Sequence, residues 1–318
     1  MAKIAITGGA GFIGSNLARG LNSKGHEVVA LDDLSSGLST NIANLEIELR
    51  EGSITDIRFL SKALEDCEHI FHLAARGSVP RSISDPLKTF QVNSLGTLNV
   101  LEVSRSRGIP ITFSSSSSVY GANKEIPKNE NSWTSPLTPY GASKLSAESL
   151  VLSYSRSYGI PHKVFRFFNV FGPFQRPEHI YSAVIPKWLW SAMQNKPLVL
   201  EGDGTQSRDF TYVGDLVEVL IDSLKLDFWE NEIVNLAFGV QISLNEVIEK
   251  IRKKFPNLKI DRLQSRIGDI KHSQNDPTTL LKLFPNVQQT DFGFALEETL
   301  AWLLSNKIEI ENSPTLGD

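Results

Sequence analysis

The feature that most limits the fold of this 318-residue chain is a regular alternation of short apolar runs with helix-length segments. The runs are apolar almost without interruption, which is typical of strands covered by helices on both faces. Alternation of this kind predicts an α/β fold with a doubly wound parallel sheet. The predicted strands are Lys3–Thr7, Glu27–Asp32, Glu46–Arg50, His69–Ala74, Ile111–Ser115, Lys163–Phe168 and Ile233–Ala237.

Capping residues mark the starts of several helices. Asp85 and Thr138 each precede a proline, the arrangement of an N-cap followed by proline at the first helical position. Ser243 and Glu246 form a capping-box pattern ahead of a predicted helix at Val247–Phe255.

The alternation weakens after Phe168, which predicts a division of the chain. We expect residues 1–169, with 206–242 returning to them, to form a nucleotide-binding domain. Residues 170–205 and 243–318 are expected to form a smaller C-terminal substrate-binding lobe, placed at the carboxyl edge of the sheet.

Composition argues against several kinds of partner. The formal net charge is −4 and no block of Lys and Arg occurs, so neither nucleic acid nor an anionic membrane is the expected partner. One cysteine, Cys67, excludes an internal disulfide, and the six histidines show no metal-binding spacing. We find neither a signal peptide nor an apolar run of membrane length, so the predicted location is cytoplasmic.

A glycine-rich segment, Thr7–Gly14, lies between the first predicted strand and the first helix; we call it the glycine loop. A pyrophosphate needs close approach of the backbone and helix N–H groups pointing at it, which this arrangement offers. A tight turn can also be rich in glycine, so the loop is a weak signal alone. Asp32 then ends the second strand, where a carboxylate accepts hydrogen bonds from a ribose diol and repels a 2′-phosphate. NAD is therefore favoured over NADP.

Tyr140 and Lys144 begin a predicted helix and share one of its faces. A free tyrosine has a pKa of about 10, and lowering it to about 7 takes roughly 4 kcal/mol. A neighbouring ammonium and an oxidised nicotinamide can supply that stabilisation. The spacing itself is common by chance. It gains weight from the run Ser114–Ser118, at the carboxyl end of a predicted buried strand where ligands bind in such sheets. A flexible serine loop is the alternative.

Taken in order, these motifs resemble the extended short-chain dehydrogenases, the NAD-dependent epimerase/dehydratase family with a Rossmann fold, over almost the whole chain. His72–Ala75 and Arg166–Pro173 belong to the same resemblance. It implies that Tyr140 is the base on a sugar 4-hydroxyl, with Ser116 as its hydrogen-bonding partner. Lys144 would hold the nicotinamide ribose and lower the pKa of Tyr140. Further cofactor-binding residues implied are Gly8, Gly11, Phe12, Ile13, Gly14, Asp33, Ser36, Gly37, Ser53, Ile54, Leu73, Ala74, Ala75, Ser114, Asn93, which would brace the cofactor side, and Phe168, which would pack near the nicotinamide.

Two departures from relatives bear on this resemblance. Many relatives have Asp where this chain has Ser53, which puts one hydrogen bond to the adenine in question. Relatives that dehydrate or decarboxylate a sugar carry acidic residues where this chain has Ser117 and Ser118. Without those carboxylates, 4-epimerisation is the expected reaction.

The substrate lobe is similar to that of epimerases acting on UDP-N-acetylglucosamine. The similarity implies that Arg208 and Arg266 clamp the diphosphate, since a fork of donors suits paired oxygens. For Arg208, a surface ion pair with Asp209 is the alternative from local sequence. Ser273 is small where relatives restricted to UDP-glucose have Tyr, and so leaves space for an N-acetyl group; an exposed loop serine is its alternative. Other implied substrate contacts are Gly77, Ser78, Ser116, Ser117, Tyr140, Gln175, Ala183, Val184, Asn169 on the diphosphate, Val199 near the uracil, and Asp269 on a ribose hydroxyl.

The expected function is NAD-dependent 4-epimerisation of a UDP-hexose through a transient 4-keto sugar, preferentially UDP-N-acetylglucosamine and UDP-N-acetylgalactosamine. A UDP-glucose 4-epimerase without N-acetyl preference is the alternative. A non-catalytic NAD-binding regulator is another, although it need not keep Tyr140, Lys144 and Ser116. Relatives also imply a homodimer through helices Pro86–Arg107 and Tyr140–Tyr158.

Overall fold

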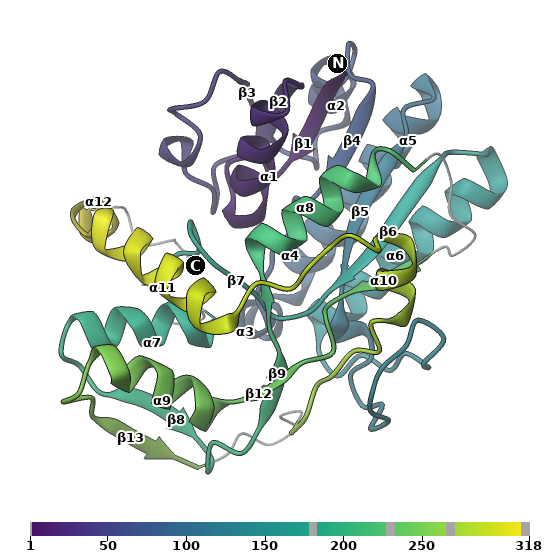
Figure 1. The fold of residues 1–318 in the computed structure, drawn as a ribbon. Helices are drawn as coiled ribbons and strands as arrows, with labels where there is room; N and C mark the ends of the chain where they lie inside the picture. The colour runs from purple at the N-terminus through teal and green to yellow at the C-terminus, as the bar shows by residue number, and fades with distance from the viewer. Residues whose placement is uncertain (1, 178–182, 227–232, 265–270, 313–318) are drawn as a thin grey trace.

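The computed structural model describes residues 2–177, 183–226, 233–264 and 271–312. Seven parallel strands form the central sheet in the order β11-β6-β5-β4-β1-β2-β3 (Figure 1). All seven strands were predicted, and their observed ends lie within two residues of the expected ones. The strands are β1 Lys3–Thr7, β2 Glu27–Asp32, β3 Glu48–Glu51, β4 His69–His72, β5 Ile111–Ser116, β6 His162–Phe167 and β11 Ile233–Leu236.

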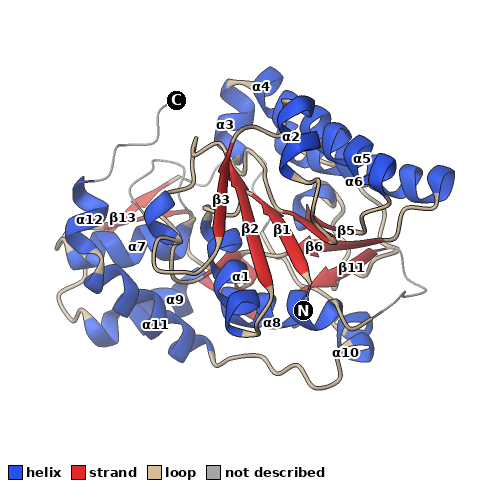
Figure 2. Cartoon of the chain, turned by 90° about the horizontal axis from the view of Figure 1, so that it is seen from above, coloured by secondary structure: helices blue, strands red, loops and turns tan. Residues whose placement is uncertain are grey.

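Helices cover both faces of this sheet (Figure 2). On one face lie α1 Phe12–Ser23, α8 Val213–Ser223 and α10 Thr278–Leu283, which bury residues such as Leu17, Leu216 and Leu280. The other face carries α2 Ile57–Ala63, α5 Gly96–Arg107 and α6 Pro139–Tyr158. Both faces are therefore covered, which explains why the strands are apolar throughout and not alternating.

The predicted helix caps are confirmed. The Asp85 carboxylate accepts the N–H of Lys88 at the start of α4 Pro86–Phe90, and the Thr138 hydroxyl accepts the N–H of Gly141 at the start of α6. Ser243 and Glu246 form the reciprocal capping box of α9 Leu244–Lys254, which begins three residues earlier than predicted. The other short helices next to the central sheet are α3 Val79–Ser84, the 3₁₀ turns η1 Ser39–Asn41 and η3 Ser117–Val119, and the π-helical turn η2 Gln91–Leu95, which joins α4 to α5.

A smaller lobe lies beside the sheet, at the lower left of Figure 1. Its core includes Trp188, Leu200, Val247 and Leu300, contributed by different elements. The lobe consists of α7 Val184–Met193, α9, α11 Phe292–Ser305, α12 Lys307–Asn312 and the parallel strands β8 Leu198–Glu201 and β13 Ile260–Leu263. Two further strand pairs complete the structure. They are β7 Val170–Phe171 with β10 Thr211–Tyr212, and β9 Ser207–Asp209 with β12 Gln241–Ser243.

The two cores divide the chain somewhat differently from the predicted boundaries. Leu280 of α10 packs with the sheet, although its segment was assigned to the lobe. Phe210 and Ile242 pack in the lobe core, although their segment was expected to return to the sheet. The assignment of separate functions to two domains stays a prediction.

Strand order reverses at β1, which has β2 on one side and β4 on the other. Connections leave β1 and β4 in opposite directions, so a crevice opens beyond their carboxyl ends.

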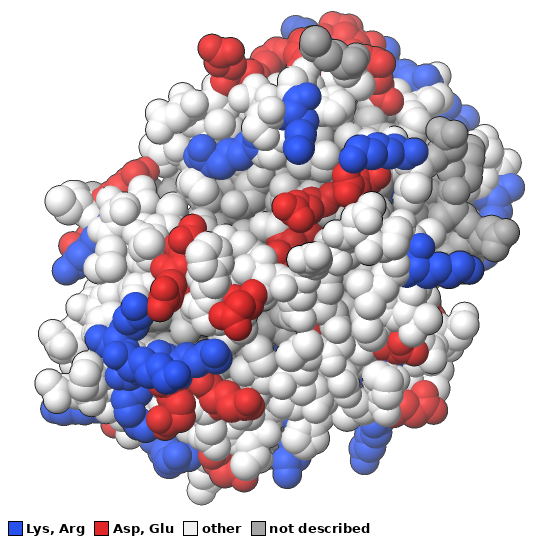
Figure 3. Space-filling model, viewed as in Figure 1, with Lys and Arg blue, Asp and Glu red and all other residues white. Residues whose placement is uncertain are grey.

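Acidic and basic side chains are interspersed over the face of the molecule in Figure 3. Within the described ranges, we find no helix with the length and apolarity needed to cross a bilayer.

Candidate active site

A cavity of about 940 Å³ occupies the crevice at the carboxyl ends of the strands. It brings together residues from the glycine loop, from the ends of β2, β4 and β5, and from α6. The predicted residues on its wall are Gly8, Gly11, Phe12, Ile13, Gly14, Asp32, Asp33, Ser36, Ser53, Ile54, Leu73, Ala74, Ala75, Gly77, Ser78, Ser114, Ser116, Tyr140, Lys144, Asn169, Gln175 and Ala183.

Gly8 and Gly14 of the glycine loop have no room for a side chain. Gly8 has φ +73°, and a Cβ there would lie 2.9 Å from the backbone of Ala74. A Cβ at Gly14 would lie 2.0 Å from the carbonyl oxygen of Gly8. Gly11 is the N-cap of α1 without a side-chain cap among the described residues, so the first N–H groups of α1 are left for a ligand. A pyrophosphate fits this arrangement.

Asp32 is buried at the end of β2, and its carboxylate is fixed by the backbone. Its two oxygens accept the N–H groups of Ala10 (3.0 Å) and Leu34 (2.9 Å). Burial raises the pKa of Asp32, and these hydrogen bonds oppose that rise. A Cβ at Gly37 would lie 2.9 Å from both carboxylate oxygens, so Gly37 supports Asp32 and is not itself on the cavity wall.

Helix α6 and strand β5 present the catalytic candidates. Tyr140 and Lys144 lie in the first two turns of α6, and Ser116 ends β5. Burial raises the pKa of Tyr140, while a hydrogen bond with Ser116 lowers it. Burial lowers the pKa of Lys144 to about 7, and the charge of Glu148 opposes this effect. A phenolate on Tyr140 and an ammonium on Lys144 would stabilise each other, which is the condition for base catalysis near neutrality.

Asn93 is a buried residue that links two segments of the cavity wall by hydrogen bonds. It is buried in the π-helical turn, where its amide donates to the Ser143 hydroxyl (2.9 Å) and accepts the N–H of Arg76 (2.7 Å). It thereby ties α6 to the loop after β4. Asn93 itself is not on the cavity wall.

Several expected contacts lie elsewhere. Phe167, not Phe168, is on the cavity wall, whereas Phe168 is fully buried against Val119, Tyr120 and Ala237. Phe167 is the last residue of β6, whereas Phe168 follows the strand and packs in a separate apolar cluster. Ser117 begins η3, Val199 lies on β8 and Ser273 lies beside β9, and these three are away from the cavity wall. Arg266 and Asp269 lie outside the described residues.

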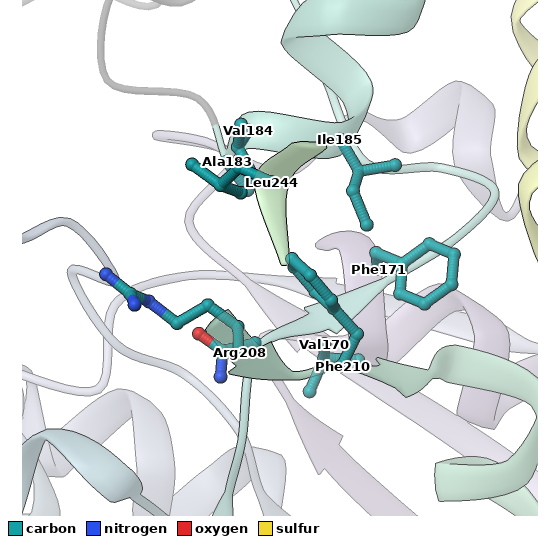
Figure 4. A pocket seen from close by; sticks show the side chains of 9 residues that line it. Val170, Phe171, Ala183, Val184, Ile185, Arg208, Phe210 and Leu244 are labelled. Atoms are coloured by element: carbon teal, nitrogen blue, oxygen red, sulfur yellow. The ribbon is translucent and has the colours of Figure 1, made fainter. Parts of the chain in front are cut away.

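A second pocket of about 240 Å³ adjoins the first, since both are lined by Asn169, Val170 and Ala183. Figure 4 shows the Arg208 guanidinium to one side of it and the apolar side chains on the other, among them Phe171, Val184, Ile185, Phe210 and Leu244. Ser273 is close to Arg208 in the fold, because its N–H donates to the carbonyl of Ser207 (3.1 Å).

Arg208 does not form the surface ion pair that local sequence allowed. Asp209 is fully buried, and its carboxylate accepts the N–H groups of Gly239 (2.9 Å) and Asn275 (3.0 Å). Burial raises the pKa of Asp209 to about 6. Arg208 instead donates to the carbonyl oxygens of Ser207 (2.9 Å) and Lys271 (3.3 Å).

The motifs missed four cationic residues on the cavity wall: Arg76, Arg81, Lys88 and Arg176. Arg76 is held by an ion pair with Asp85 (2.9 Å). Their place after β4 and after β7, at the edge where ligands bind, is the sequence signal that could have found them. Other wall residues that were not predicted are Leu31, Ser35, Gly52, Val79, Pro80, Asp85, Val92, Ser115, Phe167 and Val170.

Fold and cavity together define a dinucleotide-binding α/β enzyme with a Tyr–Lys pair in its wall. More specifically, the chain belongs to the NAD-dependent epimerase/dehydratase family, whose model matches residues 4–237. NAD is the cofactor of this family, and when bound it supplies the acceptor and donor of hydride. The glycine loop and Asp32 have the shape and charge to hold it.

Three relatives illustrate the range of similar proteins. A UDP-glucuronate 4-epimerase of Thermodesulfobacterium geofontis is 32% identical over 321 residues, which cover 96% of this chain and 97% of the relative. The solved UDP-N-acetylglucosamine 4-epimerase of Methanobrevibacter ruminantium, in complex with UDP-N-acetylmuramic acid, is 36% identical with a TM-score of 0.91, covering 96% and 99% of the two chains. The UDP-glucose 4-epimerase of Thermus thermophilus, solved with NAD, is 29% identical with a TM-score of 0.86, covering 95% and 99%.

Proposed function

We propose that this protein is a UDP-sugar 4-epimerase. The observation that carries the proposal is that Ser116, Tyr140 and Lys144 line the same cavity as the glycine loop. Ser117 and Ser118, which follow Ser116, provide no carboxylate for elimination or loss of CO₂. The 4-epimerases among its relatives support the same reaction.

In the proposed reaction, Tyr140 takes the proton of the sugar 4-hydroxyl while C4 gives up a hydride. Ser116 holds the hydroxyl oxygen through a hydrogen bond, and the Lys144 ammonium stabilises the Tyr140 phenolate. The resulting 4-keto sugar turns in the cavity and receives the hydride on its other face. Tyr140 then returns the proton, so substrate and product differ only in configuration at C4.

We further propose that the preferred pair is UDP-N-acetylglucosamine and UDP-N-acetylgalactosamine. Ser273 lies beside Ser207, next to Arg208 and off the walls of both cavities, and its small side chain is proposed to leave room for the N-acetyl group of a bound sugar. Arg208 and Asn169 would bind the diphosphate, with the apolar second pocket beside them for the nucleotide. Arg266 and Asp269 keep their proposed roles on the diphosphate and ribose, and Val199 its place near the uracil.

The test is conversion of each UDP-sugar by the purified protein, followed by separation of the C4 epimers. We expect conversion of UDP-N-acetylglucosamine. Ser273→Tyr should lose the acetylated substrates and retain the non-acetylated ones, since filling a pocket costs roughly 1–3 kcal/mol. The matched control Ser273→Ala should retain both. Unchanged conversion of UDP-N-acetylglucosamine by Ser273→Tyr would contradict the pocket assignment.

The same assay separates the alternatives. The UDP-glucose and UDP-glucuronate 4-epimerases among the relatives favour a non-acetylated substrate as the second candidate. Conversion of only non-acetylated sugars would establish it. NAD binding with no conversion of any sugar would instead indicate a non-catalytic regulator.

We also propose a homodimer in the cytoplasm. Large apolar side chains are exposed along α3, α4 and the adjoining π-helical turn, including Ile83 (63% exposed), Leu87 (84%) and Leu95. A row of exposed apolar side chains on adjacent helices is typical of a surface that another protein covers. A second copy of this chain is the proposed occupant.

A further inference from the structure

Glu148 lies one helical turn beyond Lys144 on α6, as Lys144 lies one turn beyond Tyr140. Residues four apart on a helix are neighbours on one face. This face is turned toward β5 and β6, and Lys144 and Glu148 are only 3% and 2% exposed. A buried carboxylate is therefore the next side chain along from the Lys144 ammonium.

The Glu148 carboxylate is held on its other side by strands β5 and β6. Arg166 donates to both of its oxygens, from Nε to Oε2 (3.0 Å) and from a terminal nitrogen to Oε1 (2.6 Å). The Ser115 hydroxyl donates to Oε2 (2.6 Å). Arg166 is in turn fixed by the Tyr120 hydroxyl (2.8 Å) and is itself 3% exposed. Pairing of Ser115 with Arg166 across the two strands sets this geometry.

These contacts keep Glu148 near Lys144 without an ion pair between them in the described part of the chain. The charge of the carboxylate still acts on the ammonium, because both side chains are buried and electrostatic interactions are stronger away from water. The Lys144 ammonium lies over the Phe113 ring of β5, 4.6 Å from the ring centroid, and Lys144 also lines the cavity. The same carboxylate anchors Ser115, the residue before Ser116.

We propose that Glu148 is a positioning residue that keeps the Lys144 ammonium charged in the proposed reaction while Arg166 and Ser115 hold it back from direct contact. This inference rests on the proposed function for its catalytic meaning. Its electrostatic part concerns only Lys144 and can be tested without a substrate.

The charged and titratable groups around Lys144 support this assignment. Burial lowers the pKa of Lys144, and Glu148 is the group that raises it. Tyr140 faces Lys144 from the same helix. On β4, burial and then the charge of Lys144 lower the pKa of His72 to about 3, so His72 is neutral near pH 7. The Arg166 guanidinium on β6 is paired with Glu148.

The experiment titrates Lys144 directly in the NAD-loaded enzyme. Lysine is labelled with ¹³C at Cε, and the resonance missing from Lys144→Met is followed by NMR against pH. In Glu148→Gln we expect the midpoint to fall by about 0.5 to 1 pH unit, because the ammonium loses an opposite charge. Glu148→Asp retains the charge and should move the midpoint less. The alkaline limb of turnover should shift in the same direction.

Glu130→Gln is the matched control. Glu130 belongs to the same network, since its carbonyl accepts from Arg166, but its carboxylate binds the N–H of Asn235 and the Thr279 hydroxyl, away from α6. It should leave the Lys144 midpoint in place. An equal shift in Glu130→Gln, or no shift in Glu148→Gln, overturns the proposal.

Loss of Glu148 leaves the Arg166 guanidinium buried without its partner, so the single variant can fold poorly. If the single variant does not fold, the Lys144 midpoint is measured in the double variant Glu148→Gln/Arg166→Met, which removes both charges. We expect its midpoint to fall in the same direction by a smaller amount, and a wild-type midpoint overturns the proposal. Because the titration needs no sugar, a wild type without epimerase activity would contradict the proposed function alone.

Discussion

Tyr140 and Lys144 lie on one face of α6, and burial shifts their pKa values in opposite directions. Burial favours the neutral form of each side chain, whereas base catalysis requires the phenolate and the ammonium together. The hydrogen bond from Ser116 to Tyr140 and the charge of Glu148 near Lys144 both work against burial. Chemistry at this site therefore depends on Ser116 and Glu148, the polar neighbours that oppose the effect of burial on Tyr140 and Lys144.

Tyr140→Phe tests the proposed base. The variant keeps the ring but loses the hydroxyl, so we expect turnover to fall by roughly 10²–10⁴-fold, with the folded structure retained. Turnover is measured by separating UDP-sugar epimers, and folding by circular dichroism. Activity within a few fold of the wild type would show that another group is the base.

His72 is a second buried residue with a measurable consequence. It is fully buried between the hydroxyls of Thr7 (2.7 Å) and Thr97 (2.9 Å), which link β1 and α5 to β4. Burial, and then the charge of Lys144, lower its pKa to about 3. The folded state thus favours neutral His72, and this contribution to stability is complete above the unfolded pKa of about 6.5. It is lost as the pH falls from there toward 3.

We therefore expect His72→Gln to flatten the acid dependence of stability. In the wild type, His72 should lower the free energy of unfolding by about 1.4 kcal/mol per pH unit below about pH 6.5. Urea unfolding of both proteins between pH 5 and 8 measures the two slopes. They should coincide above pH 7, where the residue is neutral in both states. Equal slopes below pH 6.5 would show that His72 does not control the acid dependence.

At the scale of elements, the N-terminus of α6 carries both the helix cap and the proposed catalytic base. Its N-cap, Thr138, stands two residues before Tyr140, so the same hydrogen bond that starts the helix also fixes the backbone beneath the proposed base. The capping box of α9 has the same chemistry in the smaller lobe. The two caps therefore form a matched pair, one two residues before the proposed base and the other directly before Leu244 of the second pocket.

Thr138→Ala and Ser243→Ala should each lower the free energy of unfolding by about 1 kcal/mol, the usual loss for a removed N-cap. Thr138→Ala should also reduce turnover at saturating substrate, because displacement of a catalytic group by a fraction of an ångström slows the reaction. Ser243 precedes Leu244 of the second pocket, so its loss should at most weaken substrate binding. Urea unfolding and epimer assays on both variants provide the comparison. Wild-type turnover in Thr138→Ala, or an equal decrease in Ser243→Ala, would argue against this coupling.

At the scale of the whole molecule, the sheet and the lobe supply different parts of the site. The sheet provides the glycine loop, Asp32 and the Tyr–Lys pair, while Gln175 and Ala183 reach the same cavity from segments next to the lobe. Helices α3 and α4 line part of this cavity, and their exposed apolar residues mark the proposed dimer surface.

Leu87→Glu tests the dimer. We expect the wild type to sediment at twice the chain mass of 35.3 kDa and the variant to sediment as a monomer, because a charge placed in an apolar interface must be desolvated without a partner. Leu304→Glu makes the same change at an exposed leucine on α11 and should leave the dimer intact. A monomeric wild type, or a dimeric Leu87→Glu, would contradict the proposed interface.

The strands, the helix caps and the glycine loop were predictable because each depends on local sequence. Apolar runs follow from burial on both faces of a sheet, and caps follow from side chains that bond their own helix terminus. The spacing of Tyr140 and Lys144 likewise sets their shared face whatever surrounds the helix. Their membership of one site with Asp32 was expected from the family resemblance and from the rule that ligands bind at the carboxyl edge of such sheets.

Tertiary structure alone decided which side chains meet across the sheet. Ser115, Glu148 and Arg166 come from two strands and a helix, and only the register of β5 against β6 brings them together. The choice of Phe167 over Phe168 depends on packing at the end of β6, because Phe168 is buried in a cluster with Val119, Tyr120 and Ala237. Arg76 and Arg81 reach the cavity wall because the chain turns there after β4. Local sequence fixes the period of each element, whereas the relative placement of elements depends on packing over the whole core.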